Sequence, residues 1–218
     1  MGDNWKDIHT REYTQSTWID KPSMFAEKAL PYFPETGLVL DLGAGQGQDS
    51  RFFAERGYRV VSTDLEEAAL ELNKQKLSAE LAANVTVQKL DLREKLPFEA
   101  DAFDVVYAHL SLHYFDAVTT QCIFDEIFRV LKPGGVFAFL VNSIHDPEYN
   151  TGEVIESDYF RVDGLLKRYF SVEAAETFAH AFTAEISDDG GETYKDSAKG
   201  IHNLIRFIGI KPGGQPRG

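Results

Sequence analysis

The amino-acid sequence predicts a single α/β domain built on a doubly wound, largely parallel sheet. From Gly37 onward, short apolar runs alternate with longer amphipathic runs. Strands that alternate with helices across short turns form βαβ units with right-handed crossovers. The chain has 218 residues, 43% hydrophobic and 26% charged, which is the size and composition of one globular domain that buries a core without disulfides or metals.

The first strand–helix unit is the clearest. The apolar run 38–40 precedes a glycine-rich turn over 41–47, and an amphipathic segment over 51–56 ends at Gly57. Glycine is common just past the end of a helix, where a positive φ is needed. We therefore expect a strand, a turn and a helix in this order.

The alternation then continues. A second strand is expected over 58–64, and residues 66–81 carry leucines at helical spacing, with acidic residues first and lysines last, which suits the helix dipole. Two more strands are expected over 85–90 and 103–108, and a helix over 117–131 is ended by Lys-Pro-Gly-Gly. The fifth strand, 135–141, is nearly all apolar, which is typical of a sheet buried on both faces.

The pattern changes after Asn142. Residues 143–164 are polar and are expected to be irregular, and Ser171 to Ala181 is expected to form a capped helix. Two β-like runs, 182–186 and 204–210, follow on either side of a turn-rich segment. They predict a C-terminal β-hairpin.

The charge balance argues against a polyanionic partner. Lys and Arg number 22 against 35 Asp and Glu, a formal charge of −13, so nucleic acid and an anionic membrane surface are not expected partners. No apolar run approaches the roughly 18 residues needed to cross a bilayer, and the polar start of the chain predicts a cytoplasmic protein. The single cysteine, Cys122, lies in an apolar helical pattern and is interpreted as a small core residue.

The glycine turn predicts a ligand site. Glycines at a strand end allow close backbone approach, and the following helix start offers free N–H groups. The dinucleotide fingerprint Gly-x-Gly-x-x-Gly is not met, because Gln48 occupies the place of the third glycine. Asp41 lies in the turn, where a carboxylate would repel a pyrophosphate but suits a cationic ligand that bears an amine and a sulfonium.

Acidic residues also end the next two strands. Asp64 can accept both hydroxyls of a ribose, and Asp91 can meet an adenine amino group while Leu92 packs on the ring. Each aspartate alone could be a helix or loop cap. Three acids at the carboxyl ends of successive parallel strands favour a ligand, because that edge is where such sheets bind them.

These residues resemble a known family. Residues 39–47, Val-Leu-Asp-Leu-Gly-Ala-Gly-Gln-Gly, resemble motif I of the class I S-adenosylmethionine-dependent methyltransferases, and Asp64, Asp91-Leu92 and 131–135 are similar to its later motifs. Residues 46–50 also resemble small bacterial methyltransferases of the type-11 or tellurite-resistance kind. The resemblance implies a Rossmann-like, seven-stranded sheet with an antiparallel last strand.

The resemblance also implies the parts of the chain and the site. The parts would be a helical cap (1–36), a cofactor-binding core (37–142), a substrate-side part with the hairpin (143–211) and a frayed tail (212–218). S-adenosylmethionine would contact Asp41, Gly43, Ala44, Gly45, Asp64, Leu65, Asp91, Leu92 and His109. The Asn-Pro-Pro-Tyr-type motif of amino-group methylators is absent, since residues 108–111 read Ala-His-Leu-Ser, which argues against DNA adenine and protein glutamine as substrates.

Residues 109–115 are the candidate acceptor-facing loop. Methyl transfer from a sulfonium is an in-line displacement that depends mainly on alignment, and a base is needed only where the acceptor must lose a proton. His109 and His113 are the candidate bases, and His113 or Tyr114 would orient the acceptor. Alternatively, the histidines satisfy local backbone groups and the aromatic rings pack under the next helix. No third ligand pairs with the two histidines by spacing, so no metal is expected.

Aromatic residues outside the core suggest the walls of an acceptor site. Rings of the N-terminal segment would either cover the site or anchor an accessory helix, and a second group would form the opposite wall. The predicted function is methyl transfer from S-adenosylmethionine to a small-molecule acceptor; a nucleotide-dependent oxidoreductase and a non-catalytic S-adenosylmethionine-binding module remain alternatives. The oligomeric state is not predicted. The aromatic residues are Trp5, Tyr13, Trp18 and Phe25, then Tyr159, Phe160 and Tyr169 with His202.

Overall fold

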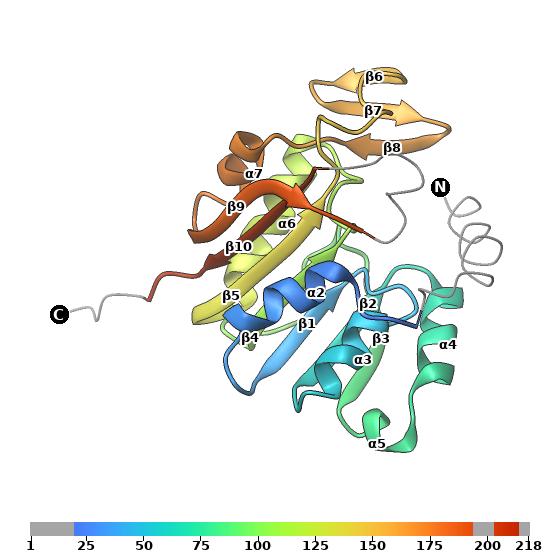
Figure 1. Cartoon of the computed structure of the whole chain (residues 1–218), viewed down its shortest axis with the longest axis vertical. Helices are drawn as coiled ribbons and strands as arrows, with labels where there is room; N and C mark the ends of the chain where they lie inside the picture. The colour runs from blue at the N-terminus through green and yellow to red at the C-terminus, as the bar shows by residue number, and fades with distance from the viewer. Residues whose placement is uncertain (1–19, 194–202, 214–218) are drawn as a thin grey trace.

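The computed structural model describes residues 20–193 and 203–213 (Figure 1). A seven-stranded sheet has the order β3-β2-β1-β4-β5-β10-β9. The first five strands in this order are parallel, and β10 is antiparallel to both β5 and β9. The predicted fold class, including the antiparallel last strand, is confirmed. The strands are β1 (Leu38–Leu42), β2 (Arg59–Asp64), β3 (Val85–Lys89), β4 (Phe103–His109), β5 (Leu131–Val141), β9 (Thr183–Gly191) and β10 (Leu204–Ile210).

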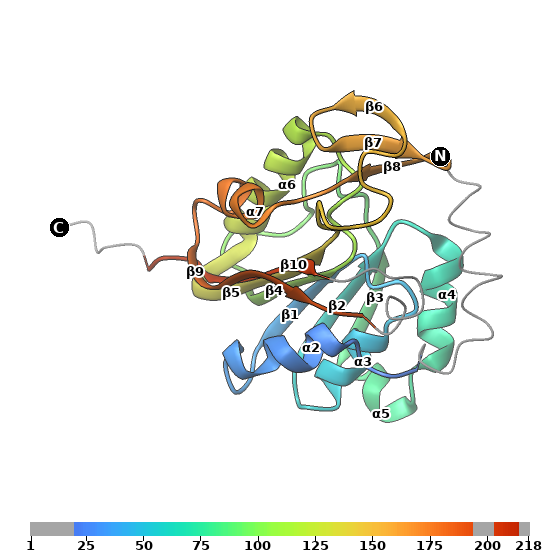
Figure 2. The same cartoon turned by 45° about the horizontal axis from the view of Figure 1, so that its top comes forward.

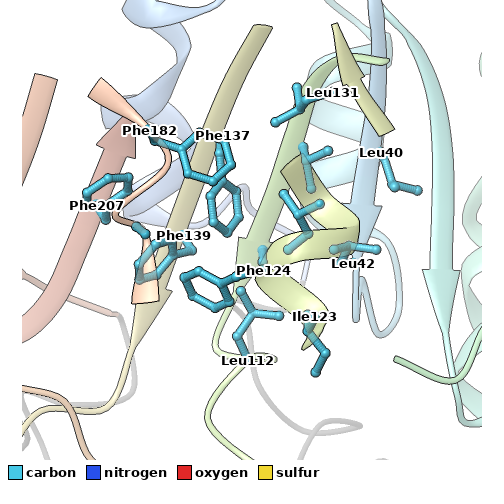
Figure 3. Close-up of a cluster of buried hydrophobic side chains, with 14 of the residues drawn as sticks. Leu40, Leu42, Leu112, Ile123, Phe124, Leu131, Phe137, Phe139, Phe182 and Phe207 are labelled. Carbon is cyan, nitrogen blue, oxygen red and sulfur yellow. The ribbon is translucent and has the colours of Figure 1, made fainter. Parts of the chain in front are cut away.

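Helices cover both faces of this sheet (Figure 2). Alternate strand residues point to opposite faces; Val39 packs in the cluster that includes α2 and α3, and Leu40 packs in the cluster that includes α6 and α7. Figure 3 shows Phe124 of α6 against Phe137 and Phe139 of β5. The helices are α2 (Met24–Ala29), the 3₁₀ helix η1 (Leu30–Tyr32), α3 (Gln48–Ala54), α4 (Glu67–Lys76), α5 (Ala79–Ala82), α6 (Ala117–Val130) and α7 (Val172–Phe178).

The segment 143–164 is not irregular as predicted. It holds the strands β6 (Glu153–Glu156) and β7 (Tyr159–Val162), which form a separate three-stranded antiparallel sheet with β8 (Leu165–Arg168). The strands are only four residues long, and the turns between them carry positive φ at Asp158, Asp163 and Gly164. Such short strands leave almost no periodicity to detect. In Figure 2 this small sheet lies above the end of the main sheet where β5 stops.

Two helix predictions also change in detail. The predicted helix over 66–81 is two helices, since α4 ends at Lys76 and Ser78 caps α5 by accepting from Leu81 N. The interpretation of Cys122 as a core residue is wrong: it is exposed. The buried face of α6 passes through Thr120 and Ile123, so the side chain of Cys122 turns outward.

The N-terminal prediction is only partly covered by the structure. Trp5, Tyr13 and Trp18 lie outside the described residues, as does His202. Phe25 is buried on the sheet, its ring centroid 5.6 Å from that of Tyr107 in β4. The proposed limits of the cap, core, substrate-side part and tail stay predictions.

Within residues 20–193 and 203–213, the helices are all too short or too polar to traverse a bilayer.

Candidate functional site

The glycine turn joins β1 to α3 and lies against the end of β2. Gly43, Gly45 and Gly47 have φ of 71°, 56° and 73°, a region that glycine adopts at little cost. Ala44 N donates to Thr63 O at 2.8 Å. This bond fixes the turn to the neighbouring strand, so its backbone is held in place before any ligand arrives.

Asp64 is brought to this turn, as the sequence predicts. Its Oδ2 accepts from Gly45 N at 2.8 Å and its Oδ1 accepts from Glu66 N at 2.9 Å. The carboxylate is half-buried, whereas the side chain of Leu65 beside it is 41% exposed. The end of β2 therefore offers an acidic acceptor next to an accessible apolar surface.

Asp41 lies beneath the turn rather than at its surface. Its side chain is 2% exposed, and its Oδ2 is 2.6 Å from Ser50 Oγ. Ser50 Oγ in turn lies 2.7 Å from Ser62 Oγ, which accepts from Asn73 Nδ2 at 2.8 Å. Burial, and next the charge of Asp49, raise the pKa of Asp41 to about 8. A carboxyl so placed is largely protonated near neutral pH.

At the end of β3, Asp91 is engaged by an arginine that sequence reasoning missed. Arg93 donates to Asp91 Oδ1 from its backbone N at 3.0 Å and from Nε at 2.9 Å. The hydrogen bonds from the Arg93 side chain lower the pKa of Asp91, against the opposing effect of burial. Leu92 is half-buried and packs against the core. The Asp-x-Arg spacing was the only indication of this pairing in the sequence.

The loop after β4 packs directly on the glycine turn. His109 ends β4 opposite Leu140 of β5, and Leu110 has a positive φ of 55°. Ser111 Oγ donates to Leu42 O at 2.6 Å. A Cβ added to Gly43 would lie 2.3 Å from Ser111 Cβ, so only glycine permits this approach. The predicted acceptor loop and the predicted cofactor turn are thus in contact.

His113 of that loop is buried and uncharged. Asn142 N donates to its Nδ1 at 3.4 Å, which places its own proton on Nε2. Burial, followed by the charges of Lys167 and His109, lowers its pKa to about 3. The Tyr114 ring centroid is 4.3 Å from that of His113. The catalytic roles of His109, His113 and Tyr114 stay predictions, and the bond from Asn142 gives His113 a local structural partner.

An ion pair from the small sheet, between buried Arg168 and half-buried Glu156, supports the same loop. Arg168 is 5% exposed, pairs with Glu156, and donates from Nε to Phe115 O at 3.0 Å. Glu156 Oε1 accepts from Ala117 N at 2.7 Å, at the start of α6. The pair therefore holds both the end of the loop and the helix that follows it. Sequence reasoning missed it because the small sheet itself was not predicted.

The aromatic residues expected to form the opposite wall are buried in this structure. Phe160 and Tyr169 belong to a separate small cluster, and Tyr159 OH donates to Tyr114 O at 3.1 Å. In the part of the chain that the structure describes, no three His, Cys, Asp or Glu side chains gather closely enough to hold a metal ion.

The chain matches known proteins over part of its length. An uncharacterised methyltransferase of Synechocystis is 37% identical over 109 residues, which are 50% of this chain and 48% of that protein. A demethylmenaquinone methyltransferase of Clavibacter sepedonicus is 37% identical over 97 residues, 44% of this chain and 38% of that protein. The methyltransferase domain family matches residues 39–135, which hold the glycine turn, Asp64 and Asp91. Residues 39–135 are thereby identified as a class I S-adenosylmethionine-dependent methyltransferase domain.

The chain spans less than half the length of those two relatives. A solved structure of an S-adenosylmethionine-dependent methyltransferase from Methanosarcina mazei shares the fold, with a TM-score of 0.71 at 20% identity over 86% of this chain and 98% of that chain. The family match ends at residue 135, before the small sheet and the β9–β10 hairpin.

The residues at the strand ends fit the cosubstrate of this family. The positive φ values of the glycine turn let a ligand approach its backbone, and Asp64 and Leu65 present an acceptor and an apolar surface side by side. Among the described residues, Asp64 forms no ion pair with a lysine or arginine. A half-buried carboxylate without a cationic partner suits a ligand that carries a sulfonium and an ammonium.

Proposed function

We propose that the protein transfers the methyl group of S-adenosylmethionine to a small, uncharged and partly apolar acceptor. The glycine turn, Asp64 and Leu65 would hold the methionine and ribose parts, and Asp91 and Leu92 the adenine. The loop over residues 109–115 would face the acceptor. S-adenosylmethionine supplies a methyl group activated by a positively charged sulfur.

The contact between Ser111 and the glycine turn carries this proposal. Because Ser111 Oγ donates to Leu42 O and its Cβ sits where a Gly43 side chain would be, the loop that would face the acceptor adjoins the methionine end of the cofactor site. An acceptor held by this loop would meet the methyl group at short range. Positioning of that kind supplies much of the acceleration of an in-line displacement.

The character of the loop favours an uncharged acceptor. Leu112 and His113 are buried, and His113 stays neutral because its pKa is lowered to about 3. The strand ends carry acidic residues, and the whole chain has a formal charge of −13, which disfavours a polyanion. His109 is the proposed base for acceptors that must lose a proton, since it ends β4 next to this loop.

Isothermal titration with S-adenosylmethionine, S-adenosylhomocysteine and NAD tests the cofactor. We expect micromolar binding of the first two and none of NAD. Asp64→Ala should weaken cofactor binding by roughly tenfold to a hundredfold through loss of charge-assisted hydrogen bonds. Asp101→Asn is the matched control, because Asp101 precedes β4, at the end of the strands opposite the glycine turn, and its carboxylate is bonded to Lys211. Binding of NAD alone would overturn the proposal.

A panel of small hydroxyl, thiol and amine acceptors then tests the transfer. Turnover should require one of these acceptors, and His109→Gln should slow transfer to hydroxyl acceptors far more than transfer to thiols. A protein that binds the cofactor tightly yet methylates none of the panel would favour the non-catalytic alternative.

A further inference from the structure

A second buried carboxylate lies under the glycine turn. Asp49 is in the first turn of α3, two residues after Gly47, and is 4% exposed. Ser23 N donates to its Oδ1 at 2.6 Å, and Ser23 Oγ and Tyr107 OH donate to its Oδ2 at 2.8 Å and 2.9 Å. Three donors therefore converge on the two oxygens of this side chain. The resemblance over residues 46–50 includes Asp49 but assigns it no role.

The donors come from distant parts of the chain. Ser23 is the N-cap of α2, where its Oγ also accepts from Ala26 N at 3.0 Å. Tyr107 lies on β4 opposite Asp41 of β1, and its ring packs against Phe25 of α2 and Phe53 of α3. Asp49 therefore joins α2, α3 and β4 at one buried point, beside Asp41 of β1.

Asp49 and Asp41 differ in the number of donors that reach them, three for Asp49 and Ser50 alone for Asp41. The charge of Asp49 adds to burial in raising the pKa of Asp41, so Asp41 is mostly neutral near pH 7. Arg51, the nearest arginine on α3, donates to Gln46 O and lies 3.7 Å from Asp20 rather than binding Asp49. Among the described residues, no lysine or arginine forms an ion pair with Asp49. The charge beneath the turn thus lacks a cation within hydrogen-bonding distance.

We propose that Asp49 is a positioning residue that makes the cofactor site select a positively charged sulfonium over an uncharged thioether. The buried carboxylate acts through the turn: it does not touch the ligand, but its field favours a cation placed above Gly43 and Gly45. Ser23 and Tyr107 fix its distance from the turn. This inference rests on the proposed placement of the cofactor over the glycine turn.

The test compares three ligands that differ in charge at one position. S-adenosylmethionine carries a sulfonium, sinefungin carries an amine in its place, and S-adenosylhomocysteine carries a neutral sulfur. Their dissociation constants are measured at pH 6. Asp41 is protonated at this pH, because burial is the largest cause that raises its pKa to about 8. Asp49→Asn removes the charge and retains the size of the side chain. Tyr107→Phe retains the charge, removes one hydrogen bond and is the matched control.

Asp49→Asn should weaken S-adenosylmethionine and sinefungin by about fivefold to twentyfold, the effect of one charge acting over roughly 10 Å at the effective dielectric constant of a protein. S-adenosylhomocysteine should change by less than about twofold, and Tyr107→Phe should leave the ratio between the ligands unchanged. A merely structural role would weaken all three ligands alike, and that result, or no change at all, would overturn the inference.

Two further variants separate a failure of this inference from a failure of the proposed function. If Asp49→Asn does not fold, Asp49→Ser replaces it, because a serine hydroxyl can still bond to Tyr107 and suits the first turn of a helix. Asp64→Ala is measured in parallel. A loss of affinity in Asp64→Ala without a change of ligand ratio in Asp49→Asn would refute the role of Asp49 alone. Failure of the wild-type protein to bind any of the three ligands would refute the proposed function together with it.

Discussion

Replacing Gly47 with alanine should damage both the fold and the cofactor turn. Gly47 precedes α3 with a φ of 73°, a conformation that costs a residue with a Cβ about 1–2 kcal/mol. The new Cβ would also lie 2.1 Å from Asn73 Oδ1. Asn73 is fully buried and is bonded through Nδ2 to Ser62 Oγ, so its side chain has little room to yield. Forcing atoms into a packed site costs about 1–3 kcal/mol.

The free energy of unfolding should therefore fall by roughly 2–5 kcal/mol, the sum of the two costs, measured by equilibrium unfolding in urea. Gly57→Ala is the matched control: its φ is 89°, but nothing lies within 4 Å of the added Cβ. It should lose only the conformational part. In the double variant Gly47→Ala/Asn73→Ala, the loss should be smaller than the sum of the two single losses by about 1–3 kcal/mol. Equal losses for Gly47→Ala and Gly57→Ala would refute the argument, since Asn73 would then offer no resistance.

Three other changes have defined outcomes. Arg168→Met should destabilise the protein by roughly 1–3 kcal/mol, because it removes the buried guanidinium that donates to Phe115 O and pairs with Glu156. It should also lower kcat for methyl transfer while the Kd for S-adenosylmethionine stays constant; a change in Kd alone would contradict the support of the acceptor loop. His113 has a folded pKa of about 3, below its ordinary 6.5, so the stability it contributes is present above pH 6.5 and is lost as the pH falls toward 3. His113→Gln should flatten acid unfolding over that range by at most about 1.4 kcal/mol per pH unit. Asp41 has the opposite sign, since its folded pKa of about 8 exceeds its ordinary 3.8; stability is lost as the pH rises toward 8, and Asp41→Asn should be less sensitive to pH between 5 and 8 in thermal unfolding.

The sequence predicts the parallel part of the fold well because its evidence is local. Each strand of that part contains a short apolar run, and β1 to β4 form where expected, whereas β5 begins at Leu131, four residues before the predicted start. The C-terminal hairpin is confirmed for the same reason, with β9 paired to β10. The small sheet is missed because its strands have only four residues and depend on contacts that cross the chain, such as Arg168 with Phe115.

The candidate site shows the same division. The positions of the glycine turn and Asp64 follow from neighbouring parallel strands, and the bond from Gly45 N to Asp64 confirms that they meet. What each group does there depends on more distant residues. Nothing near His113 in the sequence indicates that Asn142 N would bond to it or that burial would hold its pKa at about 3.

The buried carboxyl groups of Asp41 and Asp49 have different surroundings, which the sequence motif does not indicate. The motif identifies Asp41 as the acid of the glycine turn, but desolvation without a cationic partner makes its ionised form costly. Asp49, which no motif identifies, receives donors from Ser23, 26 residues earlier in the chain, and from Tyr107, 58 residues later. Asp49 thus has three donors, whereas Asp41 has Ser50 alone. The motif locates the glycine turn, and the surrounding fold decides how each of the two buried carboxyl groups is held.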